Sequence, residues 1–153
     1  MCEVYIQSRH SGLIDMETWT KDKSGYADGI GYSGEEERLL MESSSGGLRE
    51  NVGRTLGDYL KMLGNFVEML NTYRSKYQNC NKMTFSKLKV FGIQCIMTTI
   101  IRISVSTCDD GKLLYQTPRT SQVPTVFQER HHLLPLFELL THFLVCMSIN
   151  IVC

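Results

Sequence analysis

The sequence has no excess of charge of either sign. Its 16 lysines and arginines balance 16 aspartates and glutamates, so the formal net charge is zero. This balance excludes a protein that depends on bulk electrostatic attraction to nucleic acid, although it leaves room for a local basic patch. With 153 residues, of which 42% are hydrophobic and 21% charged, the chain is typical of one globular domain with a sizeable core.

Closely spaced cysteines are also missing. The six cysteines stand at positions 2, 80, 95, 108, 146 and 153, without a CxxC pair. This spacing predicts free, buried thiols in a reducing compartment and argues against a disulfide framework. The N-terminus lacks the apolar core that marks a secretory signal. We therefore expect an intracellular protein, cytoplasmic or nuclear.

Three common site motifs are absent too. Gly29 and Gly31 form a GxG without the third glycine or the following helix of a phosphate-binding loop. No GxSxG nucleophile motif occurs. His142 and Cys146 are four residues apart, but no second pair at ligand spacing accompanies them, which favours an ordinary helix over a zinc site.

One long apolar run is present. Residues 133–153 carry a single formal charge, Glu138, and are long enough to span a membrane. Because Pro135 and several polar residues interrupt the run, and no basic cluster flanks it, we favour a buried helix that continues into an apolar tail at 146–153. A tail-anchored membrane protein is the alternative.

Hydrophobic periodicity divides the chain before this run. Residues 1–24 form a weakly patterned N-terminal segment, and residues 25–145 predict a single α/β domain. Two strands are predicted at 26–32 and 37–44, followed by a long helix over 50–78. Glycines in that helix suggest a close approach to the sheet. The expected packing face of the helix consists of Leu56, Leu60, Leu63, Val67 and Leu70.

The period of the apolar residues changes to two after the long helix. Strands are predicted over 88–96, 99–107 and 113–119, with a turn at Asp110-Gly111 and a strand end at Pro118. A helical pattern returns from Thr125, and the order β-β-α-β-β-β-α predicts a mixed α/β fold with helices flanking a central mixed sheet. One face of the last helix consists of Phe127, Leu134, Phe137, Leu140 and Leu144.

Two acidic residues fall on the first pair of predicted strands. Side chains alternate along a strand, so Glu42 shares a face with Ser44, and Asp28 lies beside Glu42 if the two strands pair. Two carboxylates at one rim of a sheet suit Mg²⁺, which takes one or two carboxylates, a backbone carbonyl and several waters. The competing interpretation makes Asp28 a turn residue before Gly29 and Glu42 a solvated charge at the strand end.

Four stretches carry a resemblance to a known family. These are YADGIGY (26–32), RLLMESSSG (38–46), SKLKVFGIQCIMTTIIRISVST (86–107) and QVPTVFQERHHLLPLFELL (122–140). In this order, and over about residues 19–145, they resemble a family of small fungal proteins that is similar to the PD-(D/E)XK nuclease superfamily. The resemblance implies a restriction-endonuclease-like fold whose first helix is incomplete here, and magnesium-dependent cleavage of nucleic acid.

The same resemblance assigns the site residues. Asp28 matches the first acid and Glu42 the second, and the backbone carbonyl of Ser43 is a further candidate metal ligand. The lysine position is occupied by Ser44, which supplies neither the charge nor the reach of an ammonium group. Arg49, Arg54 and Lys61 are the nearest cations, and their spacing favours none of them.

The sequence thus leaves two function classes open. The first is a degenerate or weakly active metal-dependent nuclease, and the second is a non-enzymatic interaction module, with a protein partner, that retains only the fold. Lys82, Lys87 and Lys89, which are interleaved with aromatic residues, could form a basic edge for nucleic acid. The solvated end of a helix would have the same composition.

Overall fold

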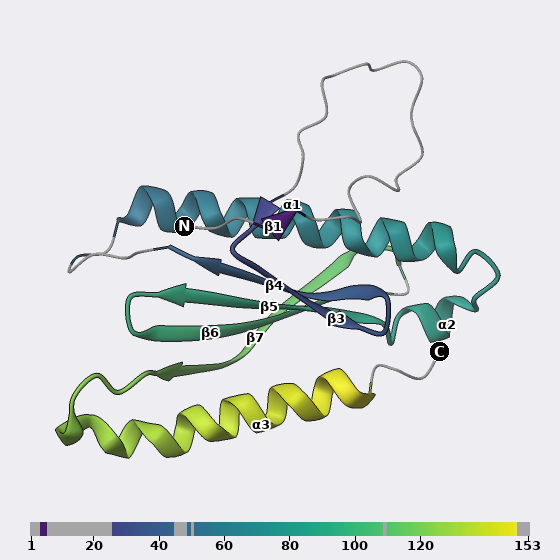
Figure 1. Ribbon diagram of the computed structural model, residues 1–153. Helices are drawn as coiled ribbons and strands as arrows, with labels where there is room; N and C mark the ends of the chain where they lie inside the picture. Colours follow the sequence, from purple (N-terminus) through teal and green to yellow (C-terminus); the bar gives the residue numbers. More distant parts are fainter. Residues whose placement is uncertain (1–3, 6–25, 45–48, 50, 109, 150–153) are drawn as a thin grey trace.

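A five-stranded mixed sheet flanked by helices organises the protein (Figure 1). The computed structural model describes residues 4–5, 26–44, 49, 51–108 and 110–149. The predicted N-terminal segment lies almost wholly outside the described residues, and so do the incomplete first helix and residues 150–153 of the predicted tail. The described elements are β1 (Val4–Tyr5), β2 (Tyr26–Ala27), β3 (Gly29–Ser33), β4 (Glu36–Ser43), α1 (Val52–Lys76), α2 (Lys82–Phe85), β5 (Lys89–Ile96), β6 (Thr99–Thr107), β7 (Leu113–Gln122), the 3₁₀ helix η2 (Phe127–His132) and α3 (Leu133–Ile149).

The sheet follows the order of the chain. Its strands are arranged β3-β4-β5-β6-β7, while β1 and β2 form a separate two-stranded ribbon. Of the described strand pairs, only β4 and β5 are parallel, and α1 connects them, as a parallel pair requires a crossover. The β3–β4 hairpin turns at Gly34, whose φ of 63° suits a glycine. The mixed α/β class and the pairing of the first two predicted strands are therefore confirmed.

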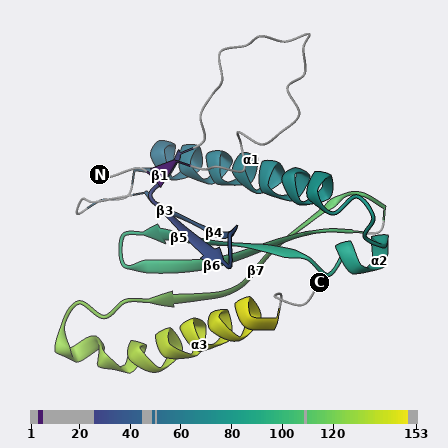
Figure 2. The same ribbon diagram turned by 45° about the vertical axis from the view of Figure 1, so that its right-hand side comes forward.

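The two long helices cover opposite faces of the sheet (Figures 1 and 2). Along β5, Gly92 faces α1, where an added Cβ would lie 2.5 Å from Cζ of Phe66 and 2.8 Å from Sδ of Met62. Phe91, the preceding residue, points to the opposite face of the sheet, because side chains alternate along a strand. Its ring contacts the ring of Phe143 on α3, with 5.7 Å between the ring centroids. Gly92 thus permits the close approach of α1, because a larger residue would press against Phe66 and Met62.

The packing face predicted for α1 is right at Leu70, which is buried, and wrong at Leu56 and Leu60. Leu56 and Leu60 are 55% and 57% exposed, and Gly57 has no neighbouring atom near its Cβ position. Two apolar stripes run along this helix, and the one that contains Met62 and Phe66 faces the sheet. The buried residues of α1 are Met62, Asn65, Phe66, Met69, Leu70 and Tyr73.

The strand end predicted at Pro118 is also wrong, because β7 continues to Gln122. This strand lies at the edge of the sheet, where a missing N–H is tolerated. Its pairing with β6 shifts register between Arg102 and Ser104, opposite the segment that contains Pro118. The bulge accommodates the proline without ending the strand.

The last helix is not the buried helix that its composition predicts. It buries Leu139 and Phe143, whereas Leu134, Phe137 and Leu144 are each more than half exposed. Within the described residues, no helix combines the length and apolar character needed to cross a membrane.

The described cysteines are free, as predicted. They are only partly buried, which corrects the expectation of buried thiols. They are Cys80, Cys95, Cys108 and Cys146.

Candidate carboxylate site

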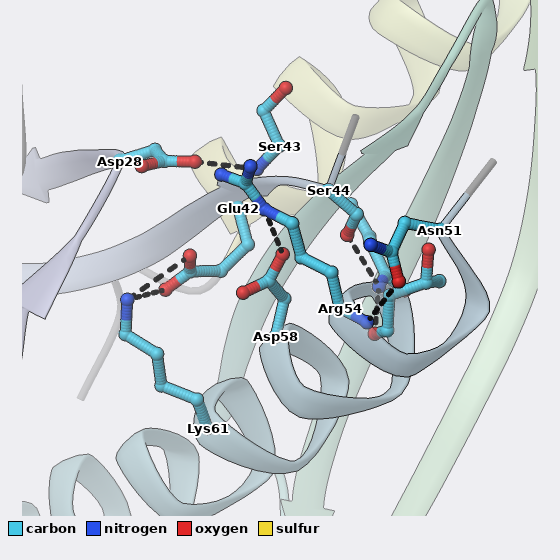
Figure 3. A network of polar contacts seen from close by, with 10 residues as sticks. Asp28, Glu42, Ser43, Ser44, Asn51, Arg54, Asp58 and Lys61 are labelled. Carbon is cyan, nitrogen blue, oxygen red and sulfur yellow. Dashed lines mark hydrogen bonds and ion pairs between the residues drawn. The ribbon is translucent and has the colours of Figure 1, made fainter. Parts of the chain in front are cut away.

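Asp28 lies in the break between β2 and β3. The register of the hairpin pairs Gly29 with Met41, which brings Asp28 to the end of β4. There its Oδ2 atom accepts a hydrogen bond of 2.7 Å from the backbone N–H of Ser43. Asp28 therefore ties the start of one strand to the end of its neighbour, at the same end of the hairpin as Glu42 (Figure 3).

Glu42 points from β4 toward α1 and is almost completely buried, with 2% of its surface exposed. Its partner is Lys61, which lies 19 residues later in the chain. The Lys61 ammonium is 3.2 Å from Oε1 and 3.3 Å from Oε2 of Glu42. Figure 3 shows Lys61 reaching up from the helix to this carboxylate. A cation is thus held at the acid pair despite the serine at position 44.

A third carboxylate stands beside this ion pair. Asp58 lies one turn before Lys61 on α1, and the Nε atom of Arg54 is 3.8 Å from its Oδ2. Burial raises the pKa of Glu42 to about 7; the Lys61 charge opposes this shift, and the charges of Asp28 and Asp58 add to it. The site therefore concentrates three acids and two cations at one end of the sheet.

Two carboxylate oxygens of this cluster are buried without a hydrogen bond in the part of the chain that the structure describes. Oε1 of Glu42 and Oδ2 of Asp58 are buried and accept no hydrogen bond from the described residues, although Oε1 lies 3.2 Å from the Lys61 ammonium and Oδ2 lies 3.8 Å from Nε of Arg54. Carboxylate oxygens are hard donors of the kind that Mg²⁺ prefers. Among the described residues, no group of three His, Cys, Asp or Glu side chains is arranged to hold a metal. The oxygen chemistry suits Mg²⁺, but Lys61 and Arg54 already stand at these two oxygens.

Ser44 has a structural role at the lysine position. It is fully buried, and its backbone N–H donates to the carbonyl of Cys95 at 2.9 Å. The amide of Gln94 donates to Oγ of Ser44 at 3.4 Å and to the carbonyl of Thr55 at 3.3 Å. Ser44 and Gln94 therefore join β4, β5 and α1, and a lysine at position 44 would carry its charge into this closed contact.

The nearby cations separate into distinct roles. Lys61 contacts Glu42, Arg54 pairs with Asp58, and Arg49 is exposed just before the helix. Asp58 and Gln94 are site residues that the motif pattern does not indicate. Asp58 had a detectable signal, because a residue three positions before Lys61 lies on the same helix face. Gln94 had no such signal in the sequence, since its role depends on strand pairing between β4 and β5.

The predicted basic edge lies far from these carboxylates. Lys89 begins β5 opposite Ser106, whereas Glu42 is level with Gln94 near the other end of that strand. Lys82 begins α2 and Lys87 is exposed just after it. The lysines therefore do not border the carboxylate site.

Comparisons with known proteins returned no match to a family model, a curated protein or a solved structure.

Proposed function

We propose that this chain is a PD-(D/E)XK-like protein that cleaves nucleic acid phosphodiesters weakly with Mg²⁺, and that Lys61 replaces the motif lysine. The observation that carries the proposal is the contact of the Lys61 ammonium with both oxygens of Glu42. An acid before one strand, an acid on the next and a lysine beside it form the group that the superfamily pattern implies. The fold proposed with it is restriction-endonuclease-like.

Each residue has a distinct task in this proposal. Asp28 and Glu42 would hold the metal, with the Ser43 carbonyl as a further ligand, and a bound Mg²⁺ would polarise the scissile phosphate. Lys61 would place positive charge where negative charge develops during cleavage. Asp58, one turn away, would hold Arg54 near the same phosphate, since an arginine suits phosphate oxygens.

The burial of Glu42 explains why weak activity is expected. A carboxyl group with a pKa of about 7 is partly protonated at neutral pH, and a protonated acid is a poor metal ligand. Lys61 must also loosen its hold on Glu42 before that carboxylate can bind a metal. Both requirements lower the population of the competent site.

The second candidate is a non-enzymatic interaction module. The observation that favours it is the 2% exposure of Glu42, since a closed ion pair can serve the fold alone. In that case Asp28, Glu42 and Lys61 would fasten the hairpin to α1 and bind no metal.

Cleavage and metal binding of matched variants test the proposal. Purified protein is incubated with single- and double-stranded DNA and RNA in Mg²⁺ or Mn²⁺, and Mn²⁺ binding is measured separately by electron paramagnetic resonance. Glu42→Gln and Lys61→Met should each lower cleavage by about 100-fold. Lys76→Met removes the same charge from the far end of α1, where Lys76 binds Glu36, and should leave cleavage unchanged.

The possible outcomes separate the two candidates. Cleavage that survives Glu42→Gln would belong to a contaminant or to another site and would reject the proposal. Wild-type protein that neither binds Mn²⁺ nor cleaves would favour the interaction module.

A further inference from the structure

A second candidate site lies at the opposite end of α1 from the carboxylates. A cavity of about 460 Å³ opens between the end of α1, the short helix α2 and the β6–β7 connection. It adjoins a smaller hollow of about 200 Å³, lined in part by Val67, Leu70 and Leu113. The two share Arg74, Phe85, Thr107 and Gly111 in their walls. The larger cavity falls within the ordinary size range of small-molecule sites.

The wall of the larger cavity carries positive charge. Arg74 of α1 and Lys82 of α2 both line it, and neither forms an ion pair with another described residue. Asp110 is the one acid among the described lining residues, and it is already bound by the ammonium of Lys112 at 2.7 Å and the backbone N–H of Lys112 at 3.0 Å. The described lining therefore favours an anion.

The same wall presents aromatic and apolar surface. Phe85 lines both hollows, and the guanidinium of Arg74 lies 5.8 Å from the centre of its ring. Tyr77 adds a second ring, whose hydroxyl is directed away to Glu36. Ser86 and Thr107 contribute hydroxyl groups. A ligand that matches this wall has an anionic group next to a flat ring.

We infer that this cavity, which we name the α1–α2 pocket, binds a nucleoside monophosphate. Arg74 and Lys82 would hold the phosphate, because a guanidinium fork and an ammonium are the usual phosphate partners. The base would lie against Phe85 and extend toward Leu70 and Leu113. A plain carboxylate would leave the apolar hollow empty, and a neutral aromatic compound would leave both cations without a partner.

The inference does not depend on the proposed nuclease activity. Arg74 lies about 20 Å along α1 from Lys61, at 1.5 Å per residue. The phosphate could belong to a free nucleotide or to the 5′ end of a strand, since the chemistry is the same.

Calorimetric titration with four probes tests the inference: AMP, adenosine, inorganic phosphate and a 5′-phosphorylated trinucleotide. AMP should bind more tightly than adenosine or phosphate, because only AMP fills both parts of the pocket. Arg74→Met and Lys82→Met should each weaken AMP binding about tenfold or more, as the loss of one charge-assisted hydrogen bond predicts. A trinucleotide that binds as tightly as AMP would identify strand ends as ligands, and a weaker one would identify free nucleotides; either supports the pocket.

Two control variants show whether a loss of AMP binding is specific to the pocket. Lys87→Met removes the same charge from an exposed lysine outside the pocket and should leave AMP binding unchanged. Glu42→Gln should also leave it unchanged, so that failure of the nuclease proposal would not count against the pocket. Equal weakening by Lys82→Met and Lys87→Met would mean diffuse attraction and overturn the inference. Absence of AMP binding to folded wild-type protein would overturn it as well.

Discussion

The two long helices lie on the same sheet but are anchored differently. α1 buries a continuous stripe that includes Met62, Phe66 and Met69, and it packs over β4, β5 and β6. Among the residues of α3 whose burial is described, only Leu139 and Phe143 are buried, and the main neighbour of this helix is the edge strand β7. Yet α3 is the more hydrophobic sequence of the two. The hydrophobicity of a helix therefore does not predict how much of it is buried, because burial depends on the residues of the sheet face against which the helix packs.

The sheet faces explain the difference. The main apolar cluster lies under α1 and includes Leu40, Val90 and Ile103. The face under α3 presents Arg102 and Ser104, which are buried and polar. The guanidinium of Arg102 meets Nδ1 of His142 on α3 and also lies 5.8 Å from the Phe91 ring centre. One helix covers a hydrophobic core, and the other covers a mixed layer of aromatic and charged contacts.

Removing one large ring from each helix should give the largest contrast. Phe66→Ala empties the core under α1 and should lower the free energy of unfolding by about 3–5 kcal/mol. Phe137→Ala changes an exposed residue of α3 and should stay within about 0.5 kcal/mol. Urea denaturation followed by circular dichroism measures both. Equal losses would show that α3 contributes as much packing as α1.

The buried acid under α1 should make stability depend on pH. The pKa of Glu42 rises from 4.5 to about 7 on folding, so its contribution to stability is fully present below pH 4.5 and is lost as pH rises from 4.5 through 7. Relative to Glu42→Gln, the wild type should lose on the order of 3 kcal/mol across that window. Denaturation curves at several pH values would measure the difference.

Glu36 provides a control of opposite sign. Burial works to raise its pKa, but hydrogen bonds from Tyr77 and Lys76 and the Arg38 charge hold the pKa below 4.5. Relative to Glu36→Gln, the wild type should lose stability only as pH falls below that value. If the two variants changed the pH dependence of stability in the same direction, the raised pKa assigned to Glu42 would be contradicted.

The close approach of α1 can be tested at Gly92. Gly92→Ala forces a methyl group against Phe66 and Met62, which should cost about 1–3 kcal/mol of stability. Combining it with Phe66→Leu should recover part of the loss, because the shorter side chain clears the space. Thermal unfolding of the single and double variants measures the coupling. Strict additivity would place the clash elsewhere.

The smallest expected effect concerns the start of each helix. The side chain of Asn51 accepts a hydrogen bond of 3.1 Å from the N–H of Arg54, whereas Val126 gives η2 no side-chain cap. Asn51→Ala should therefore cost about 1 kcal/mol. Val126→Ala should change stability by less than about 0.5 kcal/mol, since Val126 is exposed and caps nothing. Differential scanning calorimetry would resolve the pair.

The strands could be predicted closely from local pattern alone. Residues 99–107 form β6 as expected, and β5 begins one residue later than predicted, because alternation and β-branched residues report a buried strand directly. The helix faces could not be predicted in the same way. Leu56 and Leu60 belong to one apolar stripe of α1 and Phe66 to another, and the helix sequence does not tell which stripe meets Gly92 on β5.

In the candidate site, too, local pattern predicts some features, and the others depend on how the elements pack. A hairpin and strict alternation were enough to predict that Asp28 and Glu42 reach one end of the sheet. The Glu42–Lys61 contact joins a strand to a helix and depends on how α1 turns over the sheet, which spacing does not report. The burial of Ser44 has the same origin, because Gln94 and Thr55 reach it from two other elements.

The two edge strands of the main sheet are irregular, and this hinders pairing with a strand of a second molecule. An open edge strand offers unpaired backbone groups to another chain, which is a common route to aggregation. Here β3 is short and shifts register between Gly31 and Tyr32, and β7 carries Pro118 beside its bulge. A strand added from a second molecule would lose alignment at either edge after a few residues. The irregularities that accommodate one proline and one hairpin thus also limit growth of the sheet beyond a single chain.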